Sequence, residues 1–154
     1  MKIIIRNEFQ EHLKVSKATL ESIIEPIEAA AKICINALNN DRKILIFGNG
    51  GSAADAQHIA SELVGRYKIH RKGLAAIALT TDSSAITSIG NDFRFLHIFD
   101  RQVEALANSG DVAIGISTGG TSKNVVSAIS LANKLECKTI GLSGKDGGEF
   151  NAIC

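Results

Sequence analysis

The chain has 154 residues, with 17 Lys and Arg against 16 Asp and Glu, and 45% of its residues are hydrophobic. This composition is typical of one soluble domain with a sizeable core. The net charge of +1 gives no general attraction to nucleic acid or to an anionic membrane surface, because both need a clustered surplus of Lys and Arg. We therefore expect neither as a partner.

The cysteines and the apolar runs bear on the cellular compartment. Cys34, Cys137 and Cys154 form no C-x-x-C pair, and their odd number predicts no disulfide framework. The apolar start from Met1 to Ile5 is shorter than the apolar region of a signal peptide, and no run reaches the ~20 residues that cross a bilayer. We expect a protein of the reducing cytoplasm.

Two amphipathic helices are predicted before any strand. Apolar residues recur mostly at three or four spacing from Ile5 to Ile24, and a second helix is predicted from near Pro26 to Asn39. Pro26 suits a first helical turn because the N–H group that it lacks would be unpaired there in any case.

Short continuous apolar runs then alternate with helical segments. Runs without polar alternation indicate strands buried on both faces, and strand–helix alternation predicts a parallel sheet with right-handed crossovers. The predicted strands are 44–47, 75–79, 112–116 and 139–142; the predicted helices are about 53–66, a short one from Ser84, one near 96–107, and about 122–135. We expect a single α/β domain over 1–154, with a doubly wound sheet in 41–154 preceded by two helices in 1–40.

Glycine and small hydroxyl residues gather in the loops that follow these strands, where ligands of open α/β sheets bind. The loop from Ser117 to Ser122 offers four side-chain hydroxyls and two glycines ahead of a helix. This pattern favours a phosphate site, because the N–H groups at a helix N-terminus are unpaired and carry partial positive charge. The alternative is that Thr121 or Ser122 only caps the helix.

The first of these loops also fits a dinucleotide fingerprint. Gly48-x-Gly50-x-x-Ala53 follows a strand and opens a helix, but a nicotinamide site would also need an acid about 20 positions further on. The nearest acid at the end of the second strand, Asp82, lies well beyond that interval. The hypothesis of a nucleotide-dependent oxidoreductase is therefore supported only by this glycine motif.

His58 and Glu62 lie one turn apart on the helix that follows this first loop. An i,i+4 pair of this kind can reach one metal ion or one substrate, although most such pairs are ordinary surface contacts. Because the helix begins at the predicted crevice, Glu62 is a candidate base for proton transfer.

Four motifs, in the same order, resemble those of the bacterial phosphoheptose isomerases, members of the sugar isomerase (SIS) family. They are GNGGSAADAQH at 48–58, ELVGRY at 62–67, GNDF at 90–93 and GIST at 115–118. The resemblance implies an aldose–ketose isomerase that converts sedoheptulose 7-phosphate to D-glycero-D-manno-heptose 7-phosphate, for the heptose of lipopolysaccharide or capsule. It also implies a homotetramer with its sites at subunit interfaces.

The resemblance implies roles for individual residues as well. The implied substrate-binding residues are Asn49, Gly50, Gly51, Ser52, Asn91 and Asp92, with Ser117, Thr118, Gly119 and Ser122 around the phosphate. Glu62 would be the catalytic carboxylate, and His58 with Glu62 would supply two ligands to a zinc ion. The other zinc ligands would come from a C-terminal helix that follows the position of Cys154 in the family. The family usually has Ser at the position of Gly119, so this loop lacks one hydroxyl.

A non-catalytic SIS protein that binds a sugar phosphate or a protein partner is the alternative from a different class. Such relatives resemble the isomerases in their loops but lack the helix carboxylate. The presence of both His58 and Glu62 favours the enzyme.

Overall fold

The computed structural model describes residues 1–154, which divide into two compact units, Met1–Lys32 and Ile33–Cys154. The first unit contains α1 (Lys2–Ser22) and the beginning of α2 (Ile24–Asn39), as predicted. Pro26 lies in the first turn of α2, where the first main-chain hydrogen bond runs from Ile27 N–H to the Ile23 carbonyl at 3.1 Å. The N–H group that Pro26 lacks therefore costs the helix no bond.

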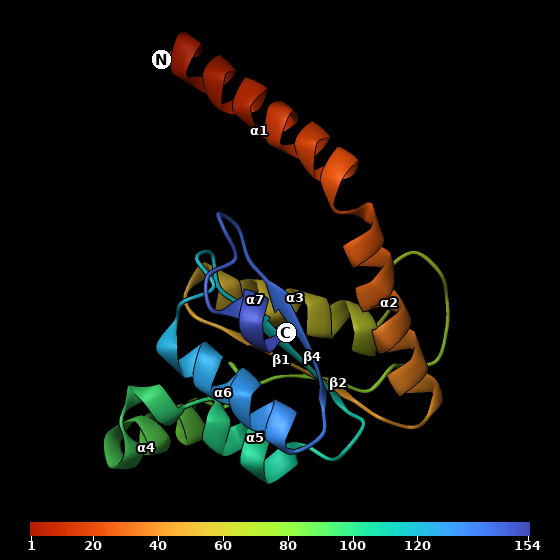
Figure 1. The fold of residues 1–154 in the computed structure, drawn as a ribbon, viewed down its shortest axis with the longest axis vertical. Helices are drawn as coiled ribbons and strands as arrows, with labels where there is room; N and C mark the ends of the chain where they lie inside the picture. Colours follow the sequence, from red (N-terminus) through yellow and green to blue (C-terminus); the bar gives the residue numbers. More distant parts are fainter. The chain divides into compact units, whose positions relative to one another are not determined.

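The second unit is a four-stranded parallel sheet with helices on both faces (Figure 1). The strands are β1 (Ile44–Gly48), β2 (Ala76–Ala78), β3 (Val112–Ile116) and β4 (Lys138–Leu142), in the order β2-β1-β3-β4. The helices are α3 (Gly51–Val64), α4 (Ser83–Phe93), the 3-10 turn η1 (Phe95–His97), α5 (Asp100–Leu106), α6 (Lys123–Lys134) and α7 (Phe150–Ile153). The α/β class and the parallel sheet are confirmed.

The core lies between the sheet and the helices α5 and α6. Leu45 and Phe47 point from β1 toward this side, and the rings of Phe47 and Phe99 stack with centroids 5.5 Å apart. Val125 and Ile129 of α6 complete the same buried cluster. The helix α3 packs on β1 and β2 from the opposite side, as Figure 1 shows.

The strands are not all buried as predicted. Every residue of β1 and β3 is buried, but Ile77 of β2 and Leu142 of β4 are 38% and 42% exposed. The prediction of burial on both faces is therefore wrong for β2 and β4, because each edge strand has a neighbouring strand on one side only.

Two helical segments also differ from the prediction. The helix predicted near 96–107 begins as the turn η1, and α5 starts only at Asp100. The four-residue helix α7 was not predicted. Its Phe150 packs over Gly141, where an added Cβ would lie 2.5 Å from the ring, so β4 needs a glycine at this position.

The strand order fixes where a ligand can bind. The chain leaves β1 through α3 toward β2, and it leaves β3 through α6 toward β4 on the other side. The crevice of such a sheet opens where neighbouring strands send their connections in opposite directions. Here it lies beyond Gly48 and Ile116, which are paired at the carboxyl ends of β1 and β3.

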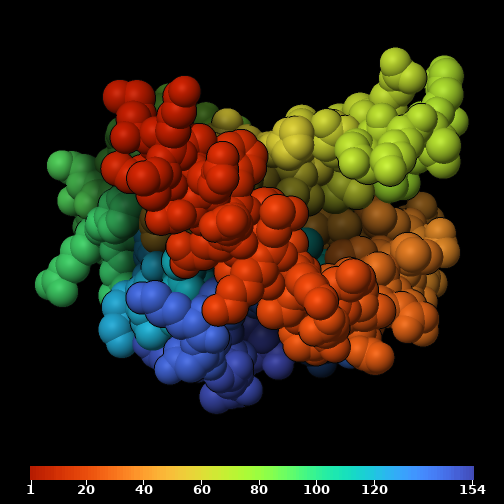
Figure 2. Space-filling view, turned by 90° about the horizontal axis from the view of Figure 1, so that it is seen from above, coloured from red at the N-terminus to blue at the C-terminus, as the bar shows by residue number.

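The basic segment 66–72 lies in the loop between α3 and β2, and this loop stands out from the surface of the second unit (yellow-green in Figure 2). Tyr67 and Ile69 are exposed there, as expected for a solvated turn. Arg71 ties the loop to the end of α3 by donating hydrogen bonds to the carbonyls of Glu62 and Leu63. No helix of the chain combines the length and the apolarity needed to cross a membrane.

Candidate active site

The loop that joins β3 to α6 holds its hydroxyl groups in a fixed arrangement. The Oγ atoms of Ser117 and Ser122 are 3.0 Å apart, and Ser117 is buried. Ser122 is the N-cap residue of α6, but its side chain makes no capping hydrogen bond. The alternative that this hydroxyl only caps the helix is therefore wrong for Ser122.

The first turn of α6 leaves main-chain donors free next to these hydroxyls. The N–H groups of Lys123 and Asn124 have no acceptor within the chain, as is general for the beginning of a helix. Gly120 adopts a φ of +63°, and an added Cβ would overlap the carbonyl oxygen of Gly147. The loop therefore requires glycine at 120, and it presents both hydroxyl and amide donors to an anion.

A cleft of about 480 Å³ opens beside this loop at the carboxyl edge of the sheet. Its walls come from the first turns of α3, the ends of β3 and β4, and the loops that follow these strands. The lining residues are Ser52, Asp55, His58, Ile59, Ile116, Thr118, Leu142, Ser143 and Gly144. The cleft thus brings together three of the sequence-predicted residues, namely Ser52, His58 and Thr118.

Asn49 and Gly50 lie at the turn between β1 and α3. Gly50 has a φ of +56°, a conformation that side chains disfavour, and Gly51 begins α3. Asn49 and Gly50 line a smaller cavity of about 170 Å³ together with Thr80 and Phe95. The side-chain amide of Asn49 is hydrogen-bonded to that of Asn124.

His58 and Glu62 are placed on successive turns of α3, as predicted. His58 lines the cleft, whereas Glu62 is half-buried one turn farther on and is not among the lining residues. No third His, Cys, Asp or Glu joins this pair to form a metal-binding group. Two ligands do not complete the four of a zinc site, so the residues of this chain do not by themselves fit the zinc that the resemblance implies.

Asn91 and Asp92 lie at the end of α4, and both are exposed. The Nδ2 atom of Asn91 donates a hydrogen bond of 2.8 Å to Oδ1 of Asp92. Neither residue lines the cleft within one copy of the chain.

Asp82, the nearest acid to the position that a nicotinamide site would need, is the N-cap of α4. Its carboxylate accepts a hydrogen bond of 2.9 Å from Ala85 N–H. This structural role accounts for Asp82 without any nucleotide, so the dinucleotide fingerprint gains no support from it.

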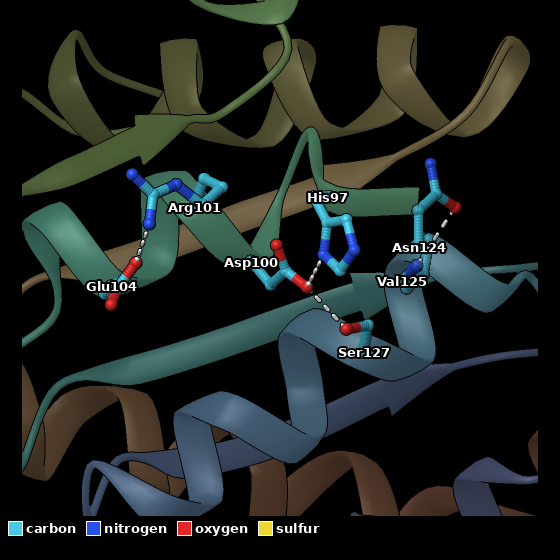
Figure 3. A network of polar contacts seen from close by, with 7 residues as sticks. All are labelled: His97, Asp100, Arg101, Glu104, Asn124, Val125 and Ser127. Carbon is cyan, nitrogen blue, oxygen red and sulfur yellow. Dashed lines mark hydrogen bonds and ion pairs between the residues drawn. The ribbon is translucent and has the colours of Figure 1, made fainter. Parts of the chain in front are cut away.

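Sequence reasoning missed a buried polar network behind the site (Figure 3). Asp100 of α5 is buried, and its Oδ2 accepts hydrogen bonds from Ser127 of α6 at 2.5 Å and from His97 at 2.9 Å, while its Oδ1 has no partner. Asn124 is buried on the same helix, one turn before Ser127. These residues contact one another across separate helices, and no regular spacing in the sequence indicates such a contact.

The comparisons with known proteins agree on one family. The SIS domain family matches residues 8–144. The phosphoheptose isomerase of Aliarcobacter butzleri is 56% identical over 154 residues, which are 100% of this chain and 82% of that protein. The phosphoheptose isomerase of Helicobacter hepaticus is 54% identical over 154 residues, 100% of this chain and 78% of that protein.

Solved structures give the same result. The phosphoheptose isomerase of Neisseria gonorrhoeae superposes with a TM-score of 0.94 at 45% identity, covering 99% of this chain and 79% of that one. The enzyme of Francisella tularensis gives 0.93 at 38% identity, covering 97% and 78%. The chain belongs to the SIS domain family, and the predicted family and fold are confirmed.

Proposed function

We propose that this chain is an isomerase that interconverts sedoheptulose 7-phosphate and D-glycero-D-manno-heptose 7-phosphate. The observation that carries the proposal is the cleft at the carboxyl edge of the sheet. It places the hydroxyl-rich loop before α6 beside Ser52, Asp55 and His58 of α3. Relatives that share half or more of their residues with this chain are phosphoheptose isomerases.

The phosphate group is proposed to bind at the beginning of α6. Ser117, Thr118 and Ser122 supply hydroxyl groups, and the first turn of the helix supplies free N–H donors and the positive end of its dipole. Lys123, in the first turn of α6, is paired with Glu149 at 3.2 Å. The proposal therefore assigns the phosphate to these neutral donors.

The sugar end of the substrate is proposed to react along α3. Conversion of a ketose to an aldose moves a proton between two adjacent carbons through an enediolate. One base removes the proton from the first carbon and returns it to the second, while the hydroxyl proton of the first carbon passes to the former carbonyl oxygen of the second. Donors near the two oxygens stabilise the negative charge in between. We assign the base to Glu62 and the donors to the loop from Asn49 to Gly51.

The proposal also includes a bound zinc ion and a homotetramer. It includes a cytoplasmic location and a role in making heptose for lipopolysaccharide or capsule. His58 and Glu62 would be two of the zinc ligands, and the metal content of the purified protein tests whether zinc is bound. Because the described residues do not complete such a site, none of the steps above depends on a metal. Asn91 and Asp92, exposed at the end of α4, would reach a cleft only across a subunit interface.

The test is conversion of sedoheptulose 7-phosphate by the purified chain, with the Aliarcobacter butzleri enzyme as a positive control. Glu62→Gln is expected to lower kcat by about 100-fold or more, the usual contribution of a general base, while substrate binding persists. Glu136→Gln is the matched control, because Glu136 lies in the turn between α6 and β4 at the other end of the sheet. Binding of sugar phosphate by the wild-type chain without any turnover would replace the isomerase by the non-catalytic alternative.

A further inference from the structure

The side chains of Asn49 and Asn124 form a reciprocal pair across the crevice. Each Nδ2 donates to the Oδ1 of the other residue, and both distances are 2.9 Å. The two residues are 75 positions apart in the sequence. Asn49 directly follows β1, whereas Asn124 lies in the first turn of α6, after the phosphate loop. We call this pair the amide clasp.

The orientation of the Asn124 amide is set by its own helix. The N–H of Val125 donates to Oδ1 of Asn124 at 3.0 Å (Figure 3), and it shares this bond with the Ser122 carbonyl, also at 3.0 Å. Only the oxygen of an amide can accept from an N–H group, so Oδ1 is fixed and Nδ2 must face Asn49. Asn124 is 4% exposed, and losing its partner would leave a buried amide unsatisfied. The clasp therefore has one favourable arrangement.

The amide clasp joins the two loops that form the proposed site. No other hydrogen bond connects the segment 49–52 to the segment 117–124, and the pairing of β1 with β3 ends at Gly48 and Ile116. One loop supplies the donors near the reacting carbons, and the other supplies the phosphate donors. Their separation must match the length of one substrate, and misplacement of a reacting group by about 1 Å can cost about 100-fold in rate.

We propose that Asn124 is a positioning residue, which acts through Asn49 to hold the loop 49–51 at the correct distance from the phosphate loop. This inference rests on the function proposed above. Asn124 touches no reacting atom in this scheme. Its loss should therefore slow the chemical step while the phosphate donors, Ser117, Thr118 and Ser122, keep binding the substrate.

A double-mutant cycle on the full chain tests the clasp. Asn124→Ala is expected to lower kcat by about 10- to 100-fold and to change KM by less than about threefold, as for a misplaced reacting group. Asn49→Ala should lower kcat at least as much. The double variant should be no slower than Asn49→Ala alone, because both substitutions break the same pair. Effects that multiply would overturn the proposal, as would a kcat for Asn124→Ala within twofold of wild type.

Asn133→Ala is the control for a purely structural loss. Asn133 lies on the same helix, donates 2.7 Å to the Ile153 carbonyl and accepts from Thr139, but it lies at the other end of α6. It should lower the melting temperature and leave kcat unchanged. If kcat falls equally in Asn133→Ala and Asn124→Ala, the effect is loss of fold and the positioning role is refuted.

Hydrogen exchange separates failure of the clasp from failure of the proposed function. If the wild-type chain has no isomerase activity, the function is wrong, and the clasp is then judged by the Ser52 and Ala53 amides, which donate hydrogen bonds of 3.0 Å to the carbonyls of Asn49 and Gly50. Their exchange should be at least tenfold faster in Asn124→Ala than in wild type, and unchanged in Asn133→Ala. Equal exchange in wild type and Asn124→Ala would refute the clasp, whatever the substrate.

Discussion

Gly119 is the one position of the phosphate loop where the chain carries no side chain but has room for one. An added Cβ would lie 3.5 Å from Oγ1 of Thr121, which is ordinary van der Waals contact, and its φ is not in the left-handed region. The next residue, Gly120, is the opposite case, since its φ is +63° and an added Cβ would meet the Gly147 carbonyl.

We therefore expect Gly119→Ser to strengthen binding of the phosphate end. One added hydroxyl donor gives about 0.5 to 1.5 kcal/mol, so the KM for the sugar phosphate should fall about 2- to 12-fold. Calorimetric titration with inorganic phosphate should show the same direction. Gly120→Ser is the control and should lower the melting temperature sharply. An unchanged affinity in a stable Gly119→Ser variant would place the phosphate elsewhere.

The sequence predicted the site unevenly, and the reason is the range of the contacts. Local patterns identified the hydroxyl-rich loop and the pair of His58 and Glu62, because the residues of one loop or one helical turn lie close together in the sequence. Nothing in the sequence around Asn124 distinguishes it from other helix residues. Its role follows from its contact with Asn49, which is 75 positions away and is brought close only by the fold. Asp100 is the same case, because its partner Ser127 lies on another helix.

An ion pair connects β1 and β3 at the end of the sheet away from the cleft. Lys43 precedes β1 and Asp111 precedes β3; Nζ of Lys43 lies 2.6 Å from Oδ2 of Asp111. The carboxylate also accepts from the N–H groups of Lys43 and Asn108. Burial alone would raise the pKa of Asp111, but the hydrogen bonds from Lys43 and Asn108 and the Lys43 charge outweigh it and lower the pKa.

This lowered pKa predicts how stability depends on pH. A carboxyl group with a folded pKa below its ordinary value of 3.8 stabilises the fold above that value, and the contribution is lost as the pH falls toward the folded pKa. We expect Asp111→Ala to lower the free energy of unfolding by about 2 kcal/mol at pH 7, with a smaller difference from wild type below pH of about 3.5. Urea unfolding at several pH values measures both quantities.

Glu104→Gln controls for the loss of a surface charge. Glu104 pairs with Arg101 at 2.7 Å, but both side chains are about half exposed, so the change should be under about 1 kcal/mol at any pH. A difference between wild type and Asp111→Ala that stays constant from pH 7 to 3 would contradict the assigned pKa shift.

The elements of the fold were predicted well where their pattern depends on the core. The central strands β1 and β3 are continuous apolar runs with fully buried residues. The edge strands β2 and β4 carry similar runs but stay partly exposed, since a sequence pattern does not reveal which strands end at an edge. The helix α5 begins at Asp100, which is bonded to Ser127 of α6, a contact that no local sequence pattern shows.

The helix α1 carries an apolar face that its own unit, Met1–Lys32, leaves exposed. Ile5, Phe9, Leu13 and Leu20 fall within an arc of about 80° at about 100° per residue, and each is more than half exposed. No residue of α1 is buried. An uncovered apolar stripe of this length is typical of an interface, which agrees with the tetramer in the proposed function.

Breaking this stripe should therefore change the assembly before it changes the sheet. Leu13→Glu places a charge inside the apolar arc, and an interface core tolerates an unpaired charge poorly. Light scattering after size exclusion should show wild type as an assembly larger than one chain and Leu13→Glu as a smaller species with an unchanged circular dichroism spectrum. Lys14→Glu is the control, because position 14 lies outside the arc, and it should assemble as wild type does. If Leu13→Glu assembles normally, this face is not the interface, and if wild type is monomeric, the proposed tetramer is wrong.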